Sequence, residues 1–181
     1  EDGLPSDVVH GIAAEPDAVW LATEAVNYNG QWRGGAARHD VQHAAWTTNS
    51  HADGLVSDDL TAVVVDATGR KWFGSSKKGI SLYDGRNWRS YTAADGLDSD
   101  HVRALAAAAD GTIWAGTDAG LNRFVAGPAG GPPSVTRMTI TPSGSLPGAV
   151  LDFQALASPG VVSYDWRSDR DGALSSEAGF R

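Results

Sequence analysis

Aromatic and cationic side chains that are suited to ligand binding occur in two stretches of the sequence. They are Tyr28, Trp32 and Arg33 in the first stretch and Lys77 and Lys78 in the second. Aromatic rings stack on sugar rings, and lysine and arginine pair with carboxylates. These residues therefore predict a site for a small molecule or a glycan, and the cations suit acidic glycans.

Two groups of residues resemble metal ligands. His39 and His43 flank Asp40, but four residues of strand separate two side chains by about 13 Å, which is too far for one ion. Only a local turn would bring the two side chains together, so the sequence favours His39 as a residue that fills an aromatic position at a strand end. Asp169 and Asp171 precede Gly172 as in the start of a calcium loop, but the later carboxylate is missing and a turn is expected. We predict no metal and no cofactor.

Familiar catalytic motifs are missing from the sequence. It contains no Gly-x-Ser-x-Gly elbow, no glycine-rich phosphate loop that ends in Gly-Lys-Ser/Thr, and no His-Glu-x-x-His pair. Binding is therefore favoured over catalysis, although a site assembled from distant loops stays open.

An internal repeat organises the chain up to residue 125. Asp53 recurs as Asp95, Trp72 as Trp114 and Trp46 as Trp88, each 42 residues later. We expect copies at residues 2–52, 53–94 and 95–125, and the first copy is longer because of extra residues between Thr23 and Gly35. Four short strands in a copy of about forty residues are typical of a propeller blade.

The central copy predicts strands over residues 60–66, 70–75, 79–83 and 88–92. Residues 103–109 have helical propensity, but their counterpart 61–67 is rich in valine, so we expect a strand. The repeated Trp72 and Trp114 are expected in equivalent buried positions between blades.

Strand parity predicts where a ligand would bind. In an up-and-down blade, the link between strands two and three lies on the same face as the link to the next blade. The segment 23–35 and the lysine pair therefore share a face, and binding is usually found in such connections. Two alternatives are that this segment only covers a blade edge, or that the site lies in the channel near His10, Thr61 and Arg103.

The repeat resembles the two-component-regulator propeller repeat. The resemblance rests on Gly96-Leu97-x-Ser99, on Gly111-x-x-Trp114-x-Gly116-Thr117-x-x-Gly120-Leu121-x-x-Phe124, and on Trp88-x-x-Tyr91-Thr92. It implies the extracytoplasmic sensor propeller of a bacterial histidine kinase or a related secreted protein, in the periplasm or outside the cell. Because closed propellers have four to eight blades, we expect the remaining blades in a longer chain.

A change of composition after Phe124 predicts a second unit. Residues 126–134 form a Gly/Pro linker, and residues 135–181 resemble the first half of a PKD-type immunoglobulin-like domain. We therefore expect an all-β chain, with three antiparallel blades, the last without its outer strand, followed by a partial β-sandwich.

The composition limits the classes of partner that the chain is expected to bind. The net charge is −8 and the lysines and arginines are scattered, which argues against nucleic acid. No apolar run is long enough to span a membrane, and there is no cysteine. The functions that stay open are a ligand-sensing or binding propeller, a propeller enzyme that resembles streptogramin lyase, and a cell-surface adhesion protein.

Overall fold

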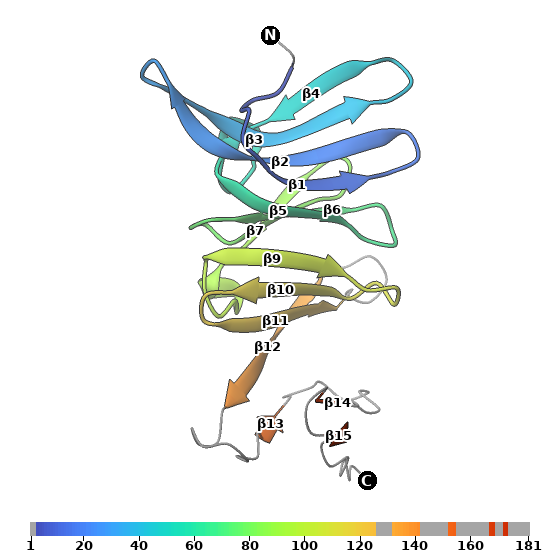
Figure 1. Ribbon diagram of the computed structural model, residues 1–181, viewed down its shortest axis with the longest axis vertical. Coiled ribbons are helices and arrows are strands. Elements are labelled where there is room, and N and C mark those ends of the chain that lie inside the picture. Colours follow the sequence, from blue (N-terminus) through green and yellow to red (C-terminus); the bar gives the residue numbers. More distant parts are fainter. Residues whose placement is uncertain (1–2, 126–131, 142–151, 155–166, 169–171, 174–181) are drawn as a thin grey trace.

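Figure 1 shows the computed structural model, which describes residues 3–125, 132–141, 152–154, 167–168 and 172–173. The strands of residues 9–141 form three antiparallel sheets that follow one another along the long axis of the molecule. Each sheet has its first four strands in sequence order, as in the blades of a propeller. We call them blades 1, 2 and 3.

The strand bounds follow the repeat. Blade 1 contains β1 (Val9–Ala14), β2 (Ala18–Tyr28), β3 (Gln31–Asp40) and β4 (Ala45–Asn49). Blade 2 contains β5 (Leu60–Val65), β6 (Lys71–Ser75), β7 (Ile80–Tyr83) and β8 (Trp88–Tyr91). Blade 3 contains β9 (Val102–Ala107), β10 (Ile113–Thr117), β11 (Gly120–Val125) and β12 (Ser134–Thr141).

The expected strand in the alanine-rich segment is confirmed. β9 covers Val102–Ala107 and pairs with β10, and Val102 is completely buried. The helical propensity of alanine is a weak local preference, and the pairing with β10 and the burial of Val102 outweigh it.

The outer strand of blade 3 corrects the sequence prediction. β12, which we had assigned to the second unit, pairs with β11 from Ser134–Val125 to Met138–Leu121. Val135 packs against the core shared by blades 2 and 3, and Met138 is buried. β12 therefore completes blade 3. The prediction that this blade lacks its outer strand is wrong.

Three short strands follow β12 among the described residues. β13 (Asp152–Gln154) pairs with β12, and β14 (Arg167–Ser168) pairs with β15 (Gly172–Ala173). Most of the residues that carry the immunoglobulin-like prediction, with Asp169 and Asp171, lie outside the described part of the chain. The second unit therefore stays a prediction.

Repeated tryptophans join each blade to the next. The ring of Trp20 lies 6.0 Å from that of Phe73 in blade 2, and the ring of Trp72 lies 5.0 Å from that of Phe124 in blade 3. Trp72 is completely buried, whereas Trp114 is only half-buried. The predicted equivalence in burial is wrong, because Trp114 lies on the far face of blade 3, which no blade in the described residues covers.

A second repeated device, which the sequence analysis missed, starts each new blade. The 3-10 helices η1 (His51–Asp53) and η2 (Ala93–Asp95) each follow a capping box, Ser50 with Asp53 and Thr92 with Asp95. Each ends at a glycine with a φ near 110° and is followed by a buried leucine. The Asp-Gly-Leu motif is therefore a turn that anchors the entering chain in the core.

Candidate functional site

The predicted parity of the connections is confirmed by one backbone hydrogen bond that recurs in all three blades. In each blade, an N–H group in strand two or directly after it donates to a carbonyl just before strand one. The pairs are Glu24 to Val8 at 2.9 Å, Ser76 to Asp59 at 3.1 Å and Asp118 to His101 at 3.1 Å. The link between strands two and three and the link that leads into strand one therefore lie on one face, which we call the hairpin face.

The extra residues of the segment 23–35 extend β2 and β3 and do not form an irregular connection. The two strands pair to Tyr28–Gln31 and turn at Asn29-Gly30, where both residues have positive φ. Asn-Gly is the sequence signal for such a two-residue hairpin. The extended hairpin projects at the edge of blade 1 in Figure 1.

Tyr28 and Arg33 lie together on one side of this hairpin. The guanidinium carbon of Arg33 lies 5.9 Å from the centre of the Tyr28 ring, and the Tyr28 hydroxyl donates to Asp7 at 3.2 Å. Trp32 pairs with Asn27, so strand alternation directs its side chain to the other side. Trp32 is 71% exposed.

Lys77 and Lys78 lie in the connection between β6 and β7, and both are exposed. The Lys78 N–H donates to Ser75 Oγ at 2.9 Å, which shapes the turn. The structure gives no contact between these lysines and the aromatic residues of the hairpin. The five predicted site residues therefore share a face but form two separate groups.

Asp59 links the two groups. Its Oδ1 accepts a hydrogen bond from Ala25 N–H at the base of the hairpin, at 3.4 Å, and its Oδ2 accepts from the Ser76 hydroxyl. A carboxylate between two connections holds the hairpin at a fixed position relative to the β6–β7 turn. Asp59 was not among the predicted site residues.

The alternative site residues His10 and Arg103 each contact a carboxylate on the same face. His10 Nε2 lies 2.9 Å from Glu24 Oε2, and Arg103 Nη2 donates to Asp118 Oδ2 at 2.9 Å. The hydrogen bond from Arg103 lowers the pKa of Asp118. Thr61 instead donates its hydroxyl to Val102 O at 2.8 Å, across the junction with blade 3.

His39 fills an aromatic position in β3, as predicted, whereas His43 lies in a turn and not on the strand that the prediction assumed. His39 is half-buried, and its ring centre lies 4.5 Å from that of Trp46. His43 lies in the turn after β3, where Nδ1 is 3.0 Å from Asp40 Oδ1. Within the residues that the structure describes, no three His, Asp or Glu side chains gather as metal ligands.

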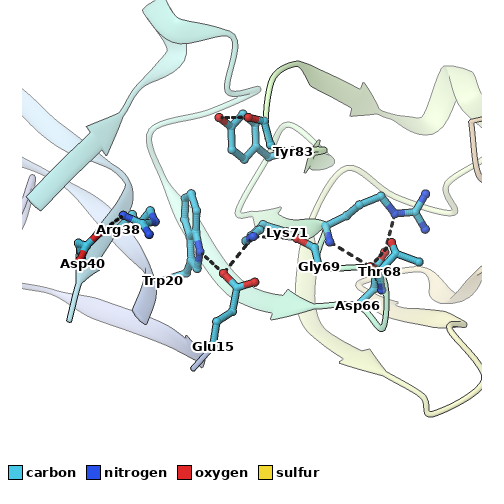
Figure 2. A network of polar contacts seen from close by, with 11 residues as sticks. Glu15, Trp20, Arg38, Asp40, Asp66, Thr68, Gly69, Lys71 and Tyr83 are labelled. Carbon is cyan, nitrogen blue, oxygen red and sulfur yellow. Dashed lines mark hydrogen bonds and ion pairs between the residues drawn. The ribbon is translucent and has the colours of Figure 1, made fainter. Parts of the chain in front are cut away.

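The opposite face carries a polar network that joins blades 1 and 2 (Figure 2). Glu15 Oε2 accepts from Trp20 Nε1 at 2.8 Å and from Lys71 Nζ at 2.9 Å. Asp66, which is buried, accepts from Trp72 Nε1 at 3.0 Å and from Arg70 Nε at 2.7 Å. Burial opposes the charge on Asp66, but the hydrogen bonds outweigh it and lower the pKa of Asp66 to about 2. This network stabilises the fold.

Comparison with protein-family models identifies a repeat in blade 3. Residues 96–119 match the family described as two component regulator propeller. No curated protein matches the chain. In the described residues, no helix is long and apolar enough to cross a membrane.

Solved structures share the fold. The extracellular domain of BT3049 from B. thetaiotaomicron, assigned to a hybrid two component system, has a TM-score of 0.55 and 20% identity over 67% of this chain. The extracellular domain of BT4673, assigned to a one component system of the same organism, has a TM-score of 0.57 and 18% identity over 73%. PorZ, a surface component of the type-IX secretion system of Porphyromonas gingivalis, has a TM-score of 0.51 and 17% identity over 82%.

This chain covers only 16% of the BT3049 extracellular domain, 18% of the BT4673 extracellular domain and 22% of the PorZ chain. At these identities the likeness extends to the fold alone. The chain is thus all-β, with propeller blades, and it carries a two-component-regulator propeller repeat at residues 96–119.

Proposed function

We propose that the hairpin face binds an extracytoplasmic small molecule or glycan, and that the chain is the sensing or binding part of a longer propeller. The observation that carries the proposal is Trp32, a tryptophan that is 71% exposed on a hairpin longer than its counterparts in blades 2 and 3. Exposed aromatic residues on a rigid scaffold are typical of binding surfaces.

Two further observations support this function. Arg33 and Tyr28 lie on the other side of the same hairpin, so both of its sides carry residues that favour recognition. The solved structures that share the fold include extracellular domains assigned to one-component and hybrid two-component systems. We propose the same location for this chain, with the remaining blades as its intramolecular partners and no direct role in nucleic-acid binding.

The experiment is a binding screen followed by substitution. The chain is tested against glycan and metabolite panels, and the best ligand is titrated against Trp32→Ala, Arg33→Ala and the control Trp46→Ala on the β4 strand. We expect Trp32→Ala to weaken binding by about 30-fold, which corresponds to about 2 kcal/mol for a central aromatic contact. Unchanged affinity in both hairpin variants, with the fold intact, would place the site elsewhere.

A further inference from the structure

The first strand of every blade contains a β-bulge at the same repeat position. In blade 1, Val9 pairs with Thr23 and Gly11 with Ala22, so His10 is the extra residue. In blade 2, Leu60 and Ala62 pair with adjacent residues of β6, so Thr61 is extra. In blade 3, Val102 and Ala104 pair with adjacent residues of β10, so Arg103 is extra.

A bulge directs one side chain away from the alternation of its strand, and bulges are frequent beside functional sites. The residue before each bulge is apolar: Val9, Leu60 and Val102. The bulged residue itself is a histidine, a threonine or an arginine. The bulge is therefore the same in the three blades, whereas the polar side chain at the bulge differs from blade to blade.

The three bulged residues lie on neighbouring strands. β1 contacts β5, and β5 contacts β9. The hydroxyl of Thr61 donates to Val102 O of the next blade, which places the second bulge directly beside the third. The three polar groups therefore form one row along the inner strands, at the end of each strand that meets the hairpin face.

His10 and Arg103 each contact a carboxylate, and both contacts are accessible to solvent. The His10 and Glu24 side chains are 43% and 45% exposed, and the Arg103 and Asp118 side chains are 66% and 41% exposed. His101 Nδ1 also lies 3.5 Å from Asp118 Oδ2. Arg103 donates to Asp118 through Nε and Nη2, and a guanidinium has five N–H donors, so donors remain for a ligand.

We infer that this row of bulged residues binds the uncharged, hydroxyl-rich part of a ligand. A hydroxyl group donates to a carboxylate and accepts from a guanidinium, so it joins an ion pair without breaking it. An anionic ligand would instead compete with Asp118 for Arg103 and would face the carboxylate of Glu24. The inference rests on the proposed function, because it concerns a second part of the same face.

Histidine NMR signals of the full chain test this inference. The probes are the methyl glycosides of glucose, galactose, mannose and xylose at high millimolar concentration, with methyl glucuronide as the anionic counterpart. We expect at least one neutral probe to shift the imidazole signals of His10 and His101. His43, in a turn on the opposite face, serves as the internal control and should not move.

Matched arginine variants give the second readout. Arg103→Lys keeps the charge but loses the planar guanidinium with its several N–H donors. We expect it to weaken binding of the neutral probe about 10-fold. Arg86→Lys, an exposed arginine in the turn after β7, should leave affinity unchanged. The inference is overturned if no neutral probe shifts His10 and His101, if only methyl glucuronide does, if His43 shifts equally, or if Arg103→Lys binds like Arg86→Lys.

The outcome also separates this inference from the proposed function. If Trp32→Ala weakens binding and Arg103→Lys does not, the hairpin binds the ligand and the bulged row does not. If Arg103→Lys weakens binding and Trp32→Ala does not, the bulged row is the site and the hairpin proposal is wrong.

Discussion

The indole Nε1 of Trp72 donates a 3.0 Å hydrogen bond to Oδ2 of Asp66, and both side chains are buried. The same relationship joins Trp20 to Glu15 in blade 1. In blade 3 the corresponding residue, six positions before Trp114, is Ala108. The indole–carboxylate pair therefore accompanies the two tryptophans that are buried by a following blade.

Removal of the buried carboxylate should destabilise the protein strongly. Asp66→Ala leaves the Trp72 N–H, the Thr68 hydroxyl and the Arg70 guanidinium without their acceptor. We expect a loss of about 3 kcal/mol in the free energy of unfolding, measured by urea denaturation. Asp84→Ala, in an exposed turn, is the control. A loss in Asp66→Ala no larger than in this control would contradict the structural role.

Asp66 should also make the stability depend on pH. Its folded pKa, about 2, lies below the ordinary value of 3.8, so the stabilisation is complete above the ordinary value. It is lost as the pH falls through the folded value, because protonation removes the acceptor charge. Urea midpoints measured from neutral pH down to pH 2 should therefore fall less steeply in Asp66→Asn than in the wild type. Parallel curves would show that another group controls acid unfolding.

The contact between Glu15 and Lys71 should couple blades 1 and 2. Their side chains are only 18% and 13% exposed, and Lys71 also lies over the Trp20 ring at 5.3 Å. A double-mutant cycle with Glu15→Gln and Lys71→Met should give a coupling of about 1–2 kcal/mol. The exposed pair Arg103–Asp118 should give less than about 1 kcal/mol. Equal coupling in the two cycles would contradict a special role for the blade contact.

Two glycines with similar backbone angles should respond differently to substitution. Gly79 and Gly85 have φ of 85° and 99°, but a Cβ at Gly79 would clash with the Tyr91 carbonyl oxygen, whereas nothing lies within 4 Å at Gly85. Gly85→Ala should cost about 1 kcal/mol for the left-handed conformation alone. Gly79→Ala should cost about 3 kcal/mol or more, since the clash adds to that strain. Thermal melts of both variants decide it.

Folding of the blades should not require a metal ion. Apolar residues at equivalent positions fill the two cores between the blades, around Trp72 and around Phe73. Thermal melts with and without a chelator should therefore have the same midpoint. A clear fall in the midpoint after chelation, restored by one added divalent ion, would contradict this prediction.

The blade architecture could be predicted because it is local and repeated. A recurrence of 42 residues fixes which segments are equivalent and places four strands in each copy. The outer strand of blade 3 could not be predicted in the same way, since Ser134–Thr141 has no counterpart pattern and its partner is chosen by tertiary pairing. The burial of Trp114 likewise depends on a neighbouring blade and not on its own position.

The candidate site was predicted only in part. The hairpin face followed from strand parity, and Tyr28, Trp32 and Arg33 followed from residue type. The bulges at His10, Thr61 and Arg103 were not predicted, because a bulge is a one-residue difference in register between two strands. The sequence of one strand alone does not reveal such a difference. A comparison of the three copies could have shown that this repeat position holds a different polar residue in each copy.

β12 is the last strand of blade 3 in the sequence and pairs antiparallel with β11, and this geometry affects how the blade responds to a pulling force. Tension applied at Thr141 reaches β11 first at the pair Met138–Leu121, at the end of the strand far from the connection between Val125 and Ser134. The hydrogen-bonded pairs then open one after another instead of sharing the load. The outer strand of blade 3 is therefore the first part of that blade to yield, while β9, β10 and β11 stay paired.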